Sequence, residues 1–147
     1  PAEREEVDMK TAAEGDFVIA KLEDGEDLFE SLKAIVKSNR VDSGTVLWGI
    51  GMVRDFDVGY FDGREYRRTV FAAPHELIAL HGSITARSDP MFHLHLAAGN
   101  PDKGVVGGHL FKATVSTLNE ICIARFLTIR MTRAVNSRSG LRELVLG

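Results

Sequence analysis

The sequence is poor in several residue types, and each shortage narrows what the protein can be. It has one cysteine, Cys122, so no disulfide can form within the chain. Low cysteine content is typical of proteins in a reducing compartment, and we expect a cytoplasmic location. No apolar run approaches the roughly 20 residues that a membrane-spanning helix requires. The charged start, PAEREEVDMK, also lacks the apolar stretch of a secretory signal, so we expect no membrane partner.

An excess of positive charge is missing as well. Acidic residues (21) outnumber lysine and arginine (18), which gives a formal net charge of −3. This balance argues against a surface devoted to nucleic acid. Arg64, Arg67 and Arg68 cluster around Tyr66 and could contact a phosphate, but a solvated hairpin edge is the better interpretation. No phosphate-binding glycine loop and no serine–histidine–aspartate spacing is present.

The remaining composition indicates one ordinary globular domain, since 44% of the residues are hydrophobic and 27% are charged. Residues 1–15 form a polar N-terminal segment, which we expect to be loosely ordered through residue 14, and residues 16–147 form the domain. One clear helix is predicted at residues 24–40, where apolar residues recur at spacings of three and four. Asp24 is the candidate N-cap of this helix.

The rest of the chain is rich in β-branched and aromatic residues separated by turn signals, which predicts strands. Asp62-Gly63 and the segment GNPDKG (99–104) are the strongest turn signals, so we expect a hairpin at each. Trp48 and the phenylalanines are predicted to lie in the core. One helix against many hairpin-connected strands predicts an α+β fold. The expected strands are 16–22, 43–62, 66–71, 75–86, 91–98, 105–117, 120–131 and a short closing strand within 139–146.

Three of the five histidines form a pattern that favours metal binding. His93 and His95 are two residues apart on a predicted strand, so their side chains share one face, opposite Phe92, Leu94 and Leu96. If residues 99–104 form the hairpin loop, either His93 or His95 pairs with His109 on the next strand. Gly107 and Gly108 leave room there for an ion or for a close backbone. Three neutral imidazoles on one patch form a site for zinc or another divalent transition metal, with an open fourth position.

Other candidate residues have more ordinary interpretations. A lone histidine is more often structural than functional, and we interpret His75 and His81 in that way. Glu76 and Glu120 could supply a fourth ligand or a general base, but a solvated strand end is the simpler interpretation of each. Cys122 alternates with isoleucines and is predicted to be a small packed residue.

The histidine motif also carries a family resemblance. The stretch FHLHLAAGNPDKGVVGGHL (92–110), followed by VSTLNEICI (115–123), resembles the signature of the plants-and-prokaryotes conserved (PPC) domain family. The resemblance extends upstream through HELIALHGSIT (75–85), the segment GTVLWGIGMVRDFDVGYFD (44–62) and the helix at 24–40. It also extends to SGLRELVL (139–146), and so covers roughly residues 16–147.

This resemblance implies a fold, an assembly and a site. The implied fold is a mixed, strongly curved β-sheet packed with a helix, and the implied assembly is a homotrimer. The family's histidine motif falls on His93, His95 and His109. Plant members combine this domain with AT-hook motifs that bind DNA, and stand-alone prokaryotic members are often labelled DNA-binding by analogy. This chain has no Arg-Gly-Arg-Pro hook, which would make the minor-groove contacts.

Four functions therefore remain open at this stage. The first is a metal-binding homotrimer of unassigned activity, which could be an enzyme that activates water or polarises a carbonyl. The second is a DNA-associated regulator, and the third is a structural assembly module. A cupin-like metalloenzyme is a distant fourth, because Ala97-Ala98-Gly99-Asn100 follows His95 where a cupin needs a glutamate. We favour the first, with the catalytic residues unassigned.

Overall fold

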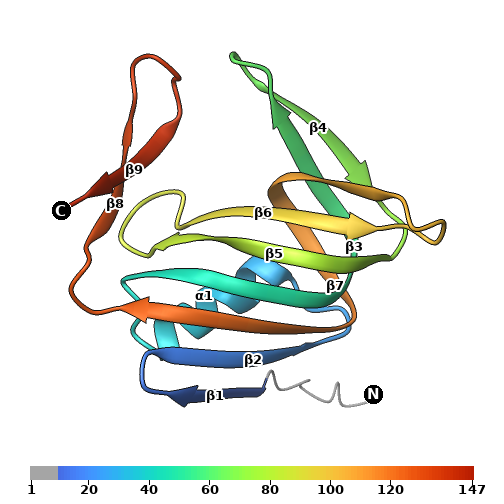
Figure 1. The fold of residues 1–147 in the computed structure, drawn as a ribbon, viewed down its shortest axis with the longest axis horizontal. Helices are drawn as coiled ribbons and strands as arrows, with labels where there is room; N and C mark the ends of the chain where they lie inside the picture. Colours follow the sequence, from blue (N-terminus) through green and yellow to red (C-terminus); the bar gives the residue numbers. More distant parts are fainter. Residues whose placement is uncertain (1–9) are drawn as a thin grey trace, which may run out of the picture.

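A computed structural model describes residues 10–147 of the chain. Nine strands and one helix follow one another in these residues (Figure 1). The two longest strands, β3 and β7, bend and pair with different partners along their lengths. The elements are β1 (Lys10–Glu14), β2 (Phe17–Glu23), α1 (Leu28–Ser38), β3 (Ser43–Phe61), β4 (Tyr66–Phe71), β5 (His75–Thr85), β6 (Phe92–Gly99), β7 (Val105–Phe126), β8 (Met131–Val135) and β9 (Arg142–Leu146).

Seven strands form one curved sheet in the order β1-β2-β7-β6-β5-β3-β4, and β3 also pairs with β7. This extra pairing closes a circuit of four strands, β3, β5, β6 and β7. Every strand pairing in the described residues is antiparallel, so the expectation of a mixed sheet is wrong. The reason is the connection through α1: β2 and β3 run in the same direction but lie on either side of β7 and never pair.

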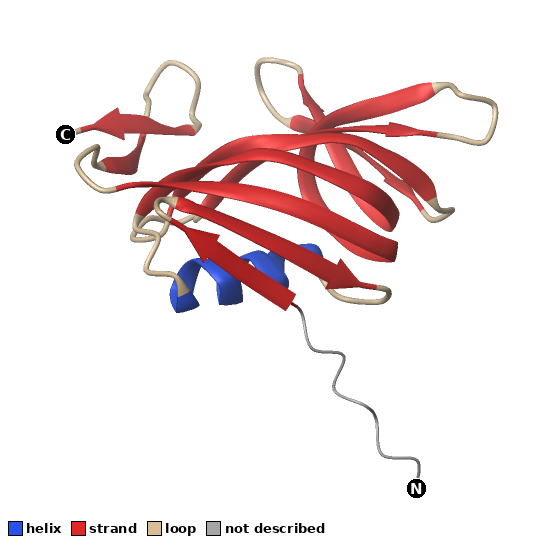
Figure 2. Ribbon diagram, turned by 60° about the horizontal axis from the view of Figure 1, so that its bottom comes forward, coloured by secondary structure: helices blue, strands red, loops and turns tan. Residues whose placement is uncertain are grey.

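The core lies between α1 and one face of the sheet (Figure 2). In α1, Leu28, Leu32 and Ile35 are fully buried, at the spacing that the sequence predicted. The strands contribute alternate residues to the same core, among them Ile121 and Ile123 of β7. A single domain with one main helix and a strongly curved sheet is thus confirmed.

The helix begins later than the sequence suggested. Asp27 caps it, because its side chain accepts a hydrogen bond from the backbone N–H of Glu30. Asp24, the predicted cap, instead accepts hydrogen bonds from the Arg54 guanidinium and from the backbone N–H of Thr117. It therefore ties the segment before the helix to β3 and β7.

Three further expectations need correction. Residues 10–14 form β1, paired with β2 along its whole length, so they are not loosely ordered; residues 1–9 lie outside the described part of the chain. The two strands predicted at 105–117 and 120–131 are one strand, β7, which ends at Phe126. Trp48 is 42% exposed and is not a core residue, because it points away from α1 on the opposite face of the sheet.

Two hairpins project from the sheet and frame one of its faces (Figure 1). The first joins β3 to β4, and Asp62 closes its turn by accepting hydrogen bonds from the backbone N–H groups of Arg64 and Glu65. The second is formed by β8 and β9. The described residues contain no helix that is long and apolar enough to cross a membrane.

Candidate metal centre

The three predicted histidines meet on the face of the sheet that points away from the core. Along β6, buried Phe92, Leu94 and Leu96 alternate with exposed His93 and His95, which confirms the predicted division of this strand. In the register between β6 and β7, His95 lies opposite His109. The loop Asn100–Gly104 sets this register, since the Asn100 side chain accepts hydrogen bonds from two backbone N–H groups within the turn.

The ring nitrogens lie at the spacing of ligands to one ion. The Nε2 atoms of His93 and His95 are 3.2 Å apart, and one nitrogen from each of the three rings falls within 4.8 Å of the others. Two nitrogens bound to a tetrahedral zinc ion at about 2.0–2.1 Å are about 3.3 Å apart. The same separation suits a hydrogen bond between two neutral rings. The three residues could therefore hold a metal ion.

Close backbone contacts around the site explain its glycines. A Cβ atom on Gly107 would clash with the carbonyl oxygen of Leu96, and one on Gly108 would lie 2.6 Å from that of Gly59. Gly108 also has a φ of +151°. Of the two roles the sequence suggested for this pair, the structure assigns the close backbone approach. These contacts fix β7 between β6 and β3, and so fix the position of His109.

The environment favours neutral imidazoles, the form that binds metal. Burial, together with repulsion by His93, His95 and Arg68, lowers the pKa of His109 to about 4. Burial likewise lowers the pKa of His93, with contributions from His95 and Arg133. Burial and the neighbouring His81 lower the pKa of His95. All three rings are therefore unprotonated at neutral pH.

An aromatic wall stands beside His109. The Tyr66 and Phe111 rings lie 4.7 Å and 4.6 Å from the His109 ring, centroid to centroid. Arg68 covers the outer side of Phe111 at 4.0 Å and pairs with Asp57. The Nδ1 atom of His109 is buried and has no hydrogen-bond partner. Tyr66 and Phe111 therefore hold the His109 ring in place but do not provide a hydrogen-bond partner for its Nδ1 atom.

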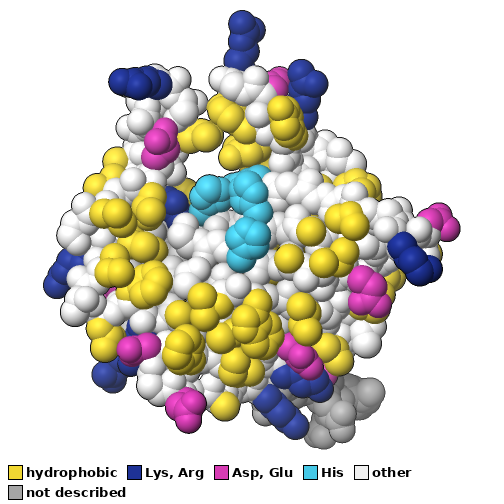
Figure 3. Space-filling view, viewed as in Figure 1, with side chains coloured by type: hydrophobic (Ala, Val, Ile, Leu, Met, Phe, Trp, Pro, Cys, Tyr) yellow, Lys and Arg dark blue, Asp and Glu magenta, His cyan; other side chains and the backbone are white. Residues whose placement is uncertain are grey.

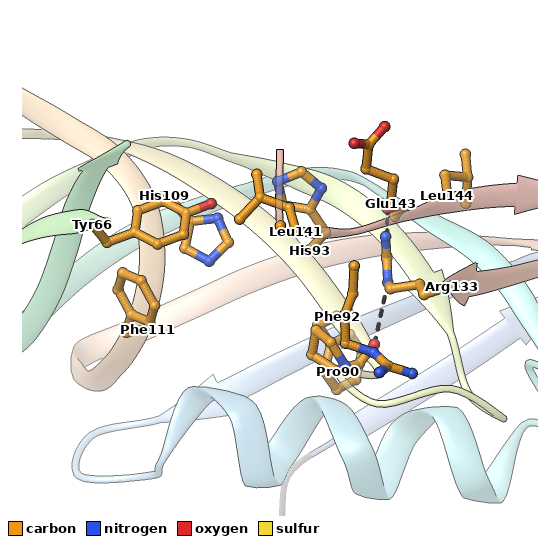
Figure 4. Close-up of a pocket in the computed structure, with 13 residues that line it drawn as sticks. Tyr66, Pro90, Phe92, His93, His109, Phe111, Arg133, Leu141, Glu143 and Leu144 are labelled. Carbon is orange, nitrogen blue, oxygen red and sulfur yellow. Dashed lines mark hydrogen bonds between the residues drawn. The ribbon is translucent and has the colours of Figure 1, made fainter. Parts of the chain in front are cut away.

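A pocket of about 610 Å³ opens beside two of the histidines. Figure 3 shows the histidines at the bottom of a gap between the two projecting hairpins. Figure 4 shows His109, Tyr66 and Phe111 at one end of the pocket, Arg133 at the other, and His93 between them. Arg133 was not predicted from the sequence, because no local motif marks it: β8 brings it to the site from 24 residues beyond His109.

The other two histidines are not part of the three-histidine group. His75 is buried between Phe56 and Phe71, and its Nδ1 atom donates to the carbonyl oxygen of Ala73, so its structural interpretation is confirmed. His81 is exposed, as expected for a surface residue, although it lies opposite His95 across the β5–β6 pairing. No other group of histidine, cysteine or carboxylate side chains suited to a metal occurs within residues 10–147.

The structure also supports the simpler interpretation of the remaining candidates, which is that they are surface or packed residues. Glu76 and Glu120 are exposed on β5 and β7 and belong to no metal-binding group. Cys122 is buried and unpaired. Arg67 and Arg68 are exposed on the β3–β4 hairpin, where they pair with Asp62 and Asp57.

The chain matches one known protein family over most of its length. The family model described as the Plants and Prokaryotes Conserved (PCC) domain matches residues 9–127. The chain belongs to this family. The match includes all three histidines and ends before β8, so Arg133 and the β8–β9 hairpin lie beyond it. No curated protein matches the chain.

Solved structures from prokaryotes share the fold. A candidate DNA-binding protein from Bacteroides thetaiotaomicron superposes with a TM-score of 0.84 at 23% identity, covering 93% of this chain and 96% of its own. A metal-containing protein from Archaeoglobus fulgidus superposes with a TM-score of 0.80 at 26% identity, covering 93% and 97%. A plant- and prokaryote-conserved protein from Pyrococcus horikoshii gives a TM-score of 0.77 at 24% identity, covering 93% and 95%.

Proposed function

We propose that the protein binds one divalent transition metal ion, zinc in the first instance, through His93, His95 and His109. The observation that carries this proposal is the convergence of three ring nitrogens within 4.8 Å on one rigid part of the sheet. Imidazole is a borderline ligand that also suits copper, nickel and iron, so the donor set favours zinc without restricting the site to it.

Two features of the site support an ion there. The buried Nδ1 atom of His109 lacks a hydrogen-bond partner, and an unsatisfied buried nitrogen costs free energy that a bound ligand at this ring could offset. The lowered pKa values of the three rings keep them neutral and ready to coordinate. The relative from Archaeoglobus fulgidus, which is described as metal-containing, supports the same proposal.

The arrangement leaves part of the coordination sphere open. His93, His95 and His109 would supply three ligands, and a zinc ion held in this way would act as a Lewis acid toward a further ligand. The pocket lies beside His93 and His109, where such a ligand would approach. The chain's own residues hold the three nitrogens in place and line this approach with Tyr66 and Phe111. The reaction, if the centre is catalytic, stays unassigned.

The proposal includes assembly as a homotrimer. The resemblance implies the trimer, and the outer face of the sheet supports an association of chains. Ile19, Cys122 and Trp48 lie in register across β2, β7 and β3 on the face opposite α1. Figure 3 shows hydrophobic side chains gathered below the histidines on this side of the molecule. An apolar patch of this kind is typical of a protein–protein interface. Its most exposed members are Phe17, Ile19, Trp48, Ile50 and Ile78, each at 42–51%.

DNA binding is the second candidate, because two solved relatives are named as candidate DNA-binding proteins. The net charge of −3 and the ion pairs that neutralise Arg67 and Arg68 argue against it. We expect weak, nonspecific binding to duplex DNA that weakens further with added salt. A mobility-shift titration at physiological salt tests this, and submicromolar, sequence-dependent binding would establish DNA as the partner instead. The third candidate is an assembly module in which any bound metal is purely structural.

Calorimetric titration tests the metal proposal directly. Metal-free protein titrated with zinc should bind one ion per chain, and His81→Ala is the matched control because it removes a histidine beside the site. Binding by wild type and His81→Ala, with loss in His93→Ala, supports the proposal. Zinc binding that is unchanged in His93→Ala would show that the ion binds elsewhere.

A further inference from the structure

The pocket beside the histidines contains a positive charge that has no acidic partner. Arg133 is 7% exposed, so its guanidinium lies within the protein rather than in solvent. Within residues 10–147, no carboxylate lies within 4.0 Å of it. Burial of a charge costs free energy unless the charge is paired. An anion bound in the pocket would offset this cost for Arg133.

Hydrogen bonds hold this guanidinium next to the centre. Its Nη2 atom donates to Ser83 Oγ at 2.8 Å, and its Nε atom donates to the carbonyl oxygen of Pro90 at 3.2 Å. Ser83 lies opposite His93 in the β5–β6 register, so these bonds place the charge beside that histidine. A guanidinium has five N–H donors, and those not used by Ser83 and Pro90 can bind an anion.

The surroundings narrow the class of anion. Phe92, Phe111, Leu141 and Leu144 give the pocket apolar walls, and its volume of about 610 Å³ lies within the roughly 300–1,000 Å³ of small-molecule sites. Glu143 also lines the pocket, with its carboxylate accepting a hydrogen bond from Ser139. One buried cation near a glutamate suits a single negative charge better than the two of a phosphate monoester.

We propose that the pocket binds a small organic carboxylate with an apolar or aromatic body, its carboxylate on Arg133 and its body directed toward the three-histidine centre. This inference rests on the proposed function for the role of that centre, and it names the ligand class that the centre would act on or sense. The planar fork of arginine binds a carboxylate through two parallel hydrogen bonds. Arg133 lies on β8, and the β8–β9 hairpin lies outside the family match.

The test compares benzoate with its neutral analogue benzamide, by calorimetry and by chemical-shift changes in the protein. Benzoate should bind wild type at least about tenfold more tightly than benzamide, because only benzoate forms charge-assisted hydrogen bonds with Arg133. Arg133→Met should remove that preference. Arg87→Met is the control, since Arg87 is exposed, pairs with Asp42 and lies outside the pocket.

The outcomes separate this inference from the metal proposal. Each titration is run on metal-free and on zinc-loaded protein, with zinc content measured independently. Preference for benzoate in protein that binds no zinc supports the carboxylate pocket and rejects the metal proposal. Equal binding of benzoate and benzamide by wild type overturns the inference even if Arg133→Met fails to fold. The inference is also overturned if inorganic phosphate displaces benzoate at a concentration lower than that of benzoate. It is likewise overturned if Arg133→Met folds and binds benzoate as tightly as wild type does.

Discussion

His95 lies directly opposite His109 in the register between β6 and β7, with the two ring centroids 5.5 Å apart. This pairing joins the histidine pair of one strand to the third histidine on the next. Since β6 and β7 are held by backbone hydrogen bonds and by close glycine contacts, the three rings are positioned before any ion binds.

Replacement of one ligand should weaken metal binding far more than replacement of its neighbour. His95→Ala leaves two imidazoles, so affinity for Co²⁺, a spectroscopic substitute for zinc, should fall at least about a hundredfold. His81→Ala removes an exposed ring opposite His95 and should change affinity little. Absorption of the Co²⁺ complex in the visible range measures both. Equal effects of the two substitutions on affinity would mean that His95 is not a ligand of the ion.

His75 should matter for stability and not for metal. Its ring packs 5.0 Å from that of Phe56, and its Nδ1 atom donates to the Ala73 carbonyl oxygen at 2.8 Å. His75→Ala should lower the free energy of unfolding by roughly 1–3 kcal/mol, since it removes a buried hydrogen bond and leaves a void. Urea unfolding measures this change, and metal content should stay at the wild-type level. Loss of metal without loss of stability would contradict the structural role.

The metal-free protein should lose stability as pH falls below about 6.5. The folded-state pKa of His109 is lowered to about 4, so between these values the unfolded chain binds a proton that the folded chain does not. The free energy of unfolding should therefore decrease over this range by roughly 1–3 kcal/mol, after allowance for solvent screening.

Thermal unfolding at a series of pH values measures this dependence. His109→Asn, which removes the titrating group, should flatten it. Zinc-loaded protein should show a steeper decrease, because protonation also releases the ion. A pH dependence that is identical in wild type and His109→Asn would exclude His109 as its source.

Assembly should depend on the apolar outer face. The chain has a mass of 16.2 kDa, and light scattering should report about three times this value for wild type. Trp48→Asp places a charge in the centre of the face and should shift the mass toward that of one chain. Tyr60→Asp is the control, because Tyr60 is 71% exposed on the β3–β4 hairpin. A wild-type monomer over a broad concentration range would exclude the trimer.

The sequence predicted the local features well because each depends on neighbouring residues. The alternation along β6, the Asp62-Gly63 turn and the apolar face of α1 all follow from short-range patterns, and all three are present. A pairing of His109 with either His93 or His95 was predictable for the same reason, since a short turn joins their strands, and the structure selects His95.

Features set by distant residues could not be predicted in this way. Trp48 has the composition of a core residue, and only the position of α1 on the other face of the sheet leaves it exposed. Arg133 reaches Ser83 across 50 residues of sequence, and no spacing rule connects them. The antiparallel character of the whole sheet likewise depends on β7 lying between β2 and β3.

Elemental analysis of protein purified from metal-replete cells tests the central claim most directly. The wild-type protein should contain one transition metal ion per chain, and the His93→Ala, His95→Ala, His109→Ala triple variant should contain almost none. The triple variant should still fold, because its core residues are unchanged, and circular dichroism checks this. A triple variant that keeps stoichiometric metal, or a wild type that binds none, would contradict the account and assign the three histidines to a polar network without an ion.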